Sequence, residues 1–380
     1  MNLFILNSAL KSGTLTDLFA WAVYLIAIIG SSLLAALVSP RQNRLGFIYV
    51  WLLLGIITSL LLSALAMNVS FGYLLIIMLF SGVAFGLGMP SALAYFAEYT
   101  VFENRGRTGG IILLLTFLVI PFVSLLPSNF PIDSYIATIW RAAGLIAFLV
   151  VRPLEKIEEP KRPVRFSFIL SDRGFLLFLI PWFMAWLIDR FEYQIFLEKY
   201  TELSVLSLSI EPIVGTVFVI VAGLLADWIG RKKVVVSGFI ALGFGYAVLG
   251  FAAQTILSQY FYIVIDGIAW GIFFVLFILV LWGDLSMNTG GHEKYYAVGS
   301  IPFFVAYLMQ YVALPYIKSI PIQAPEVSFS FASLFLFVAI LPLIYAPETL
   351  PQKKIRERQI KKYVEEAKKI AERESVKIEA

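Results

Sequence analysis

The stretch Gly223-Leu-Leu-Ala-Asp227-Trp-Ile-Gly230-Arg231-Lys232-Lys233 lies between two long apolar runs, residues 209–228 and 233–253. Apolar runs of this length can cross a bilayer as helices. An acid and three cations at their junction predict a tight, charged hairpin on one face of the membrane. We expect Gly223 to allow close helix packing and Gly230 to form a turn that a side chain would obstruct. Asp227 and Arg231 are placed to pair with each other or with a neighbouring helix end.

The composition places most of the chain in a lipid bilayer. Of its 380 residues, 60% are hydrophobic and only 14% are charged, which excludes a soluble globular fold. The absence of cysteine excludes disulfides, thiol catalysis and zinc–thiolate sites. The single histidine, His292, leaves little basis for metal or acid–base sites built on imidazole. We therefore predict no cofactor, no metal site and no nucleic-acid partner.

About eleven runs are long enough to be transmembrane helices of roughly 20 residues. They cover approximately residues 16–38, 45–67, 71–97, 108–127, 134–152, 174–195, 209–228, 233–253, 258–283, 295–316 and 327–346. Lysine and arginine gather in alternate loops, including the hairpin, and in the tail. Cytoplasmic loops are enriched in these residues, so the sequence predicts a multi-pass plasma-membrane protein whose hairpin and C-terminus face the cytoplasm.

A polar segment divides the chain. We expect an N-terminal helical bundle over residues 1–152, a cytoplasmic central loop over 153–172, a six-helix bundle over 173–350 and a charged cytoplasmic tail over 351–380. Apolar residues in the tail recur at helical spacing, which fits either a solvated helix or a partner-docking helix.

Four features in order along the chain resemble the major facilitator superfamily. The hairpin is similar to the signature loop of that family, and Ser39 to Gly46 reads as a degenerate second copy. The run Gly82-x3-Gly86-x-Gly88-x-Pro90-x4-Tyr95-x2-Glu98, followed by Arg105-Gly106, looks like the fourth helix and its loop in the sugar- and metabolite-carrying branches. Trp140-Arg141 and Pro347-Glu348-Thr349 match the sixth and the last helix. The resemblance implies an all-α, polytopic fold of two pseudo-symmetric helical bundles.

The same resemblance exposes a gap at the start of the chain. If 45–67 is the family's third helix, then 16–38 is its second, and the first is missing or is a stub at Met1–Ala9. A start codon assigned too far downstream and a shortened transporter are both open explanations.

The resemblance also implies charged pairs that are made and broken at the cytoplasmic face. Glu98 and Asp284 occupy equivalent places, each at the cytoplasmic end of the fourth helix of its half. We predict that Arg231 pairs with Asp284, and that Glu98 pairs with Arg44, Arg105 or Arg107. Two-state pairs of this kind are what alternating access needs. The alternative is a static surface ion pair, worth under about 1 kcal/mol.

Polar residues inside predicted spans are the candidates for substrate binding and coupling. Asp189 and Tyr193 share one face of the 174–195 helix, with Arg190 on the adjacent face. Asp266 and Trp270 share a face of the 258–283 helix, and Gln310 lies on the 295–316 helix. Their similar depth suggests a shared cavity. The alternatives are an interfacial Asp189–Arg190 pair, a hydrogen-bonded packed Asp266 and a Gln310 that joins helices.

These features predict a secondary transporter that moves a small metabolite by alternating access, and not an enzyme. A sugar and an organic acid both suit the aromatic faces. If transport is coupled to protons, Asp266 or Asp189 must carry the proton, since the family's usual acid on the first helix is missing. The rival hypothesis is a transporter-like protein that no longer transports and serves as a sensor or partner.

Overall fold

The structure is a computed structural model that describes residues 15–39, 44–63, 70–118, 130–153, 164–287, 289–319 and 325–350. Over these residues the secondary structure is helical, with no strand. Ten helical stretches are long and apolar enough to cross a membrane. The predicted stub, tail, most of the central loop and the second half of the 108–127 span lie outside the described residues. The all-α polytopic fold is confirmed.

The first group of helices contains most of the residues before 152. It comprises α2 (Leu15–Val38), α3 (Arg44–Ser63), α4 (Phe71–Tyr99), the 3-10 turn η3 (Phe102–Asn104), α5 (Arg105–Phe117) and α7 (Phe130–Val151). α2 packs closely on α4, and α3 lies between α4 and α7. Glycine makes the α2–α4 contact possible, because a Cβ at Gly82 would lie 2.8 Å from the Cβ of Ala27.

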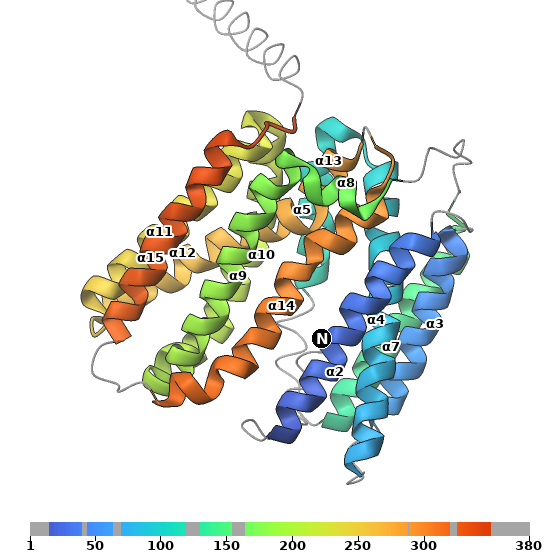
Figure 1. Ribbon diagram of the computed structural model, residues 1–380, viewed down its shortest axis with the longest axis horizontal. Coiled ribbons are helices and arrows are strands. Elements are labelled where there is room, and N and C mark those ends of the chain that lie inside the picture. The colour runs from blue at the N-terminus through green and yellow to red at the C-terminus, as the bar shows by residue number, and fades with distance from the viewer. Residues whose placement is uncertain are drawn as a thin grey trace, which may run out of the picture.

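The second group forms the larger part of the molecule (Figure 1). It comprises α8 (Phe166–Ser171), α9 (Arg173–Lys199), α10 (Thr201–Ile229), α11 (Arg231–Ala252), α12 (Ile256–Phe273), the π-helical segment η4 (Phe274–Val280), α13 (Leu281–Ser286), α14 (His292–Ser319) and α15 (Pro325–Tyr345). α11 packs on α15, and α10 packs on α12. The core of this group is strongly aromatic; Trp182, for example, stacks on Phe277 with 4.5 Å between ring centroids.

The two groups meet along two pairs of helices. α5 packs on α10 and η4, and α14 packs on α2 and α4. Phe85 on α4 meets Phe304 on α14 at 6.2 Å, and Trp21 on α2 stacks on Tyr311 at 5.2 Å. α5 of the first group therefore contacts the second group directly, and α14 of the second group contacts the first.

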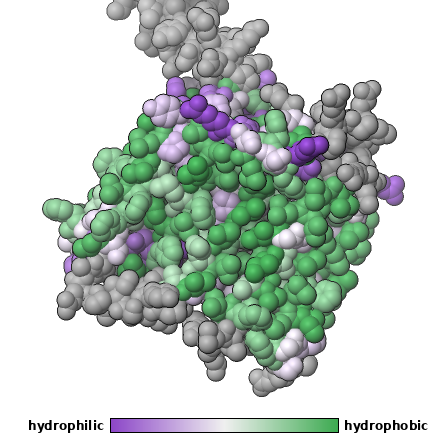
Figure 2. Space-filling view, viewed as in Figure 1, coloured by the Kyte–Doolittle hydropathy of each residue, from purple (hydrophilic) through white to green (hydrophobic). Residues whose placement is uncertain are grey.

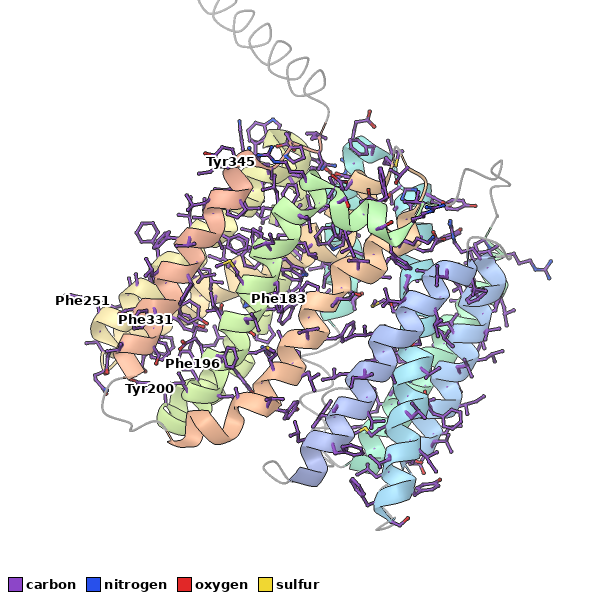
Figure 3. The ribbon with its side chains drawn as sticks, viewed as in Figure 1. Phe183, Phe196, Tyr200, Phe251, Phe331 and Tyr345 are labelled. Carbon is purple, nitrogen blue, oxygen red and sulfur yellow. The ribbon has the colours of Figure 1, made fainter. Side chains whose placement is uncertain are left out.

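The outer surface matches a membrane protein. Figure 2 shows apolar side chains over most of the visible face, with hydrophilic side chains gathered along the upper edge. This is the end at which α15 finishes in Figure 1, and we call it the Gly230 side because the hairpin lies there. Phe251 and Phe331 project from the outside of the bundle, where 94% and 55% of their areas are exposed (Figure 3).

Two predicted elements differ in the structure. The predicted spans 174–195 and 209–228 leave residues 196–208 as a loop, and this prediction is wrong. In the structure α9 continues to Lys199 and α10 already begins at Thr201. At about 1.5 Å per residue, the 29 residues of α10 are longer than a bilayer core of about 30 Å, so the helix continues beyond the apolar run that marked it. The predicted 258–283 helix contains a π-helical segment over Phe274–Val280.

Candidate functional site

The hairpin turns at Gly230, whose φ of 110° and ψ of 149° are open to glycine alone. A Cβ at this position would collide with the carboxylate of Glu348. That carboxylate accepts hydrogen bonds from the backbone N–H groups of Arg231 at 2.8 Å and Lys232 at 3.2 Å. Glu348 therefore satisfies two donors at the start of α11 and places a negative charge at its N-terminus.

Asp284 is the centre of a buried ion cluster. It accepts from Arg231 Nε at 3.1 Å, as the sequence predicts, and from the hydroxyl of Thr349 at 3.1 Å. It also pairs with Arg105, a partner that the sequence analysis assigned to Glu98 as one of three choices. The side chains of Asp284, Arg231 and Arg105 are completely buried. Arg105 and Arg231 come from different halves, so one carboxylate holds the halves together.

Asp227 makes a second link between the halves. It pairs with Arg231 at 3.0 Å, in agreement with the prediction, and accepts from the backbone N–H groups of Gly106 at 2.9 Å and Arg107 at 2.7 Å. These N–H groups begin α5, so the carboxylate lies where a helix N-terminus favours a negative charge. Gly223 touches the backbone of Gly106, and a side chain at either position would separate α10 from α5.

The N-terminal half contains an equivalent pair. Arg44 pairs with Glu98, one of the three partners that the sequence allows, and also with Glu293 at the start of α14. Glu98 corresponds to Asp284 in the repeat, whereas the place of Arg231 is taken by Phe47 in the degenerate copy, and Arg44, three residues earlier, supplies the guanidinium. Sequence reasoning missed Glu293 and the capping role of Glu348. The second had a signal, since Glu348 belongs to the matched Pro347-Glu348-Thr349 run.

A different set of polar side chains lies within the membrane. Asp189 accepts from Arg190 Nε at 2.6 Å, and both side chains are largely buried. The Arg190 guanidinium lies over the rings of Tyr307 at 4.6 Å, Tyr193 at 5.2 Å and Trp186 at 5.6 Å. The pair is thus enclosed by aromatic rings from α9 and α14.

Asp266 lies beside this pair. It is 3% exposed, it lies beside the carboxyl of Glu211 on α10, and its Oδ1 has no hydrogen-bond partner among the described residues. Trp270, one turn along α12, stands 4.4 Å from Trp186 between ring centroids. Gly267 allows the approach of α10, because a Cβ there would meet the backbone oxygen of Glu211 at 2.9 Å.

The structure therefore brings together Asp189, Arg190, Tyr193, Asp266 and Trp270, with Glu211 as an added member. We call Asp189, Arg190, Glu211 and Asp266 the membrane charge cluster. Gln310 is buried on α14, about one turn beyond Tyr307, so it flanks the cluster. The sequence analysis missed Glu211 because it lies near the start of its apolar run, where a carboxyl is commonly interfacial.

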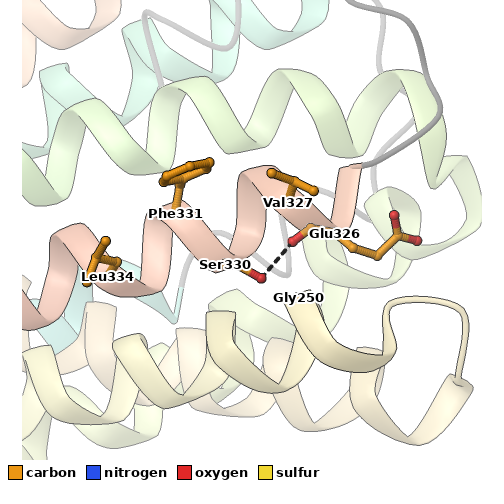
Figure 4. A pocket seen from close by; sticks show the side chains of 6 residues that line it. All are labelled: Gly250, Glu326, Val327, Ser330, Phe331 and Leu334. Atoms are coloured by element: carbon orange, nitrogen blue, oxygen red, sulfur yellow. Dashed lines mark hydrogen bonds between the residues drawn. The ribbon is translucent and has the colours of Figure 1, made fainter.

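Other polar sites are of different kinds. In the N-terminal half, Arg141 donates to the backbone oxygen of Gly55 at 2.5 Å and to Ser59, so it joins α7 to α3. Within the described ranges, no group of three or more His, Cys, Asp or Glu side chains could hold a metal ion. A surface depression of about 390 Å³ lies between the ends of α11 and α15 and is lined mainly by apolar side chains (Figure 4). It opens on the outside of the bundle, away from the membrane charge cluster.

Comparisons with known proteins agree with this architecture. The proton:xylose symporter XylE, bound to 6-bromo-6-deoxy-D-glucose, shares 16% identity over 88% of this chain and 86% of its own, with a TM-score of 0.63. A bacterial homologue of the iron transporter ferroportin in an outward-facing state shares 14% over 90% and 93%, with a TM-score of 0.69. The human organic anion transporter MFSD10 (TETRAN) shares 12% over 90% and 88%, with a TM-score of 0.64.

At these identities the three structures show a common fold and nothing about cargo. None of the curated protein sequences compared with the chain matches it. A family model described as Major Facilitator Superfamily matches residues 1–285, most of the length, and spans the hairpin, Glu98 and Asp284. With the helical fold and the predicted signature pairs in place, the chain belongs to the major facilitator superfamily.

Proposed function

We propose that this protein is a secondary transporter that moves a small metabolite across the plasma membrane by alternating access. Members of the superfamily are in general carriers of small molecules rather than enzymes, which supports this class of function. The observation that carries the proposal is Asp284, which binds Arg105 from one half and Arg231 from the other. An ion pair between halves can be made in one state and broken in the next.

The direction of the gate follows from charge. Lysine and arginine gather on the Gly230 side, so this side faces the cytoplasm, together with the C-terminus. The interlocked ion pairs of Arg44, Arg105 and Arg231 then hold the cytoplasmic gate shut. The cargo enters from the outside, and release to the cytoplasm requires these pairs to separate.

The membrane charge cluster supports proton coupling at Asp266. Asp266 and Glu211 lie side by side within the membrane, and two neighbouring carboxyls in a low-dielectric site are both ionised only at high cost, so one of them holds a proton. Of the two cargo classes that the sequence predicts, an organic acid fits less well. The guanidinium of Arg190 is already paired with Asp189, and the remaining carboxyls would repel an anion. A sugar meets no such repulsion.

The test is uptake of radiolabelled sugars and organic acids into proteoliposomes, with and without an inward proton gradient. Accumulation that depends on the gradient and is lost in the Asp266→Asn variant is the expected result for a proton-coupled carrier. Equilibration without accumulation would establish a facilitator. Glu326→Gln is the matched control, because it removes a carboxyl from the same half outside the cluster. Silence across a wide panel would favour the sensor hypothesis.

A further inference from the structure

The membrane charge cluster contains more acid than base. Three carboxyls, Asp189, Glu211 and Asp266, lie around the single guanidinium of Arg190. They come from α9, α10 and α12, and the glycines of α12 allow α10 to pack closely on α12. A fourth buried acid, Glu192, lies on α9, and its Oε2 has no hydrogen-bond partner within the described ranges. The other ionisable groups that face this region, Tyr193, Tyr246, Tyr262 and Tyr307, carry no positive charge.

This excess of acid is costly inside a bilayer. An unpaired charge in a membrane span costs several kcal/mol, so each carboxylate beyond the Asp189–Arg190 pair needs a proton or another cation. A proton on Glu211 or Asp266 neutralises one of these two neighbouring carboxyls. Oδ1 of Asp266 is buried and has no hydrogen-bond partner among the described residues. A ligand that brings positive charge would satisfy this oxygen.

The surroundings of the cluster already hold a cation. The Arg190 guanidinium lies between a carboxylate and three aromatic rings, of which Tyr307 is nearest at 4.6 Å. Carboxylates and ring faces attract cations by the same electrostatic force. Trp270 lies one turn from Asp266 on α12 and packs against Trp186 with 4.4 Å between ring centroids. Asp266 and Trp270 thus offer the same two kinds of group, a carboxyl and an aromatic ring, on one face of α12.

We infer that the cargo of this transporter is an organic cation, an ammonium or guanidinium group on an apolar body, which binds between Asp266, Glu211 and Trp270. This inference rests on the proposed transport function and differs from it in the cargo class and in the direction in which the proton moves relative to the cargo. Binding of the cation displaces the proton that one of the two carboxyls carries, and this proton leaves to water. One positive charge replaces another, so the cluster keeps its net charge and the cycle becomes an exchange of cation for proton.

The test uses three small probes that share a size range and differ in charge. Benzyltrimethylammonium is the cation, phenylacetate the anion and xylose the neutral polyol. Each is titrated calorimetrically into the purified full-length protein in detergent, and proton release is followed with a pH indicator in weak buffer. We expect only the cation to bind, with release of about one proton. Its apparent Kd should fall about tenfold for each unit rise in pH, over the range in which the free protein still carries that proton.

The variants separate the cluster from general effects. Asp266→Asn and Glu211→Gln should each weaken binding of benzyltrimethylammonium at least about tenfold and abolish proton release, and Asp266→Glu should restore part of both. Glu326→Gln should behave as the native protein, and size-exclusion profiles check that all four variants fold. Tighter binding of phenylacetate, or cation binding that survives Asp266→Asn, would overturn the inference. Gradient-driven xylose uptake without cation binding would overturn it and leave the transport function standing, whereas the absence of both would remove the two together.

Discussion

At Gly230 the backbone conformation is one that only glycine adopts without strain. Its φ of 110° is strained for any side chain, and a Cβ would also displace the Glu348 carboxylate from the start of α11. We expect Gly230→Ala to destabilise the protein by about 1–3 kcal/mol and to lower its melting temperature in detergent. Gly144→Ala is the control, since nothing lies within 4 Å of its Cβ site on α7. It should be neutral or stabilising by about 0.5–1 kcal/mol, and equal losses in both variants would contradict the argument.

Asp284 balances two buried guanidiniums, so its charge matters more than that of either partner. Asp284→Asn leaves Arg105 and Arg231 without their shared counter-charge, and breaking a buried pair in this way costs about 3–5 kcal/mol. We expect this variant to lose more transport and more thermal stability than Arg105→Gln, because Arg105→Gln leaves the pair between Asp284 and Arg231 in place.

A charge exchange tests the same cluster from the other direction. The double variant Arg231→Asp/Asp284→Arg restores the pair between α11 and α13 but sets the introduced guanidinium against Arg105. Uptake should therefore recover in part, and further when Arg105→Asp is added. Full recovery by the double variant alone would show that Arg105 does not share Asp284.

How far the sequence predicts such residues depends on whether the partner lies within a recognisable repeat. The Asp227–Arg231 and Arg231–Asp284 pairs follow from the hairpin and from the equivalent ends of two helices. The sequence analysis considered Arg105 only as a partner of Glu98, because the sequence does not reveal that α5 packs on the other half. Glu211 was missed for a related reason. Its importance comes from Asp266 on another helix, and no spacing within α10 indicates that contact.

At the scale of helices, glycine sets how closely α10 and α12 approach. A Cβ at Gly267 would lie 2.8 Å from the Cβ of Val214 and 2.9 Å from the backbone oxygen of Glu211. Because the second of these atoms belongs to the backbone, a side-chain rotation cannot relieve the clash, and one helix must shift. We expect Gly267→Ala to push the helices apart, weaken the Glu211–Asp266 contact and reduce transport severely. Gly215→Ala on the facing helix is the control, because its nearest neighbour is 3.4 Å away. Uptake assays and melting temperatures should separate the two, and similar behaviour would argue against glycine packing as the cause.

Helix ends and irregular turns were the least predictable elements. Hydropathy marks where a helix enters lipid, so it located α9 and α10 but not their polar extensions, which leave no 196–208 loop. The π-helical segment Phe274–Val280 is as apolar as its neighbours, so composition carries no sign of it. The segment joins α12 to α13 and packs on α5 of the other half.

For the whole molecule, the central question is whether the contact between halves on the Gly230 side must open during transport. Gly109 on α5 and Leu279 on η4 face each other across this contact, and a Cβ at Gly109 would lie 3.5 Å from that of Leu279. This separation falls within the range of about 3.5–4.5 Å that a disulfide needs. The chain contains no cysteine, so a pair introduced here has no competing thiol.

We expect the Gly109→Cys/Leu279→Cys variant to lose uptake on oxidation and to regain it with a reductant, because the closed side can no longer open. Ligand binding in detergent should persist in the oxidised form, since the proposed cycle has the cargo enter from the opposite side. Each single variant controls for the substitution itself, and unpaired thiols are detected by alkylation. Transport at the native rate in the fully oxidised double variant would mean that the two halves need not separate at α5 and η4, and alternating access through this gate would be rejected.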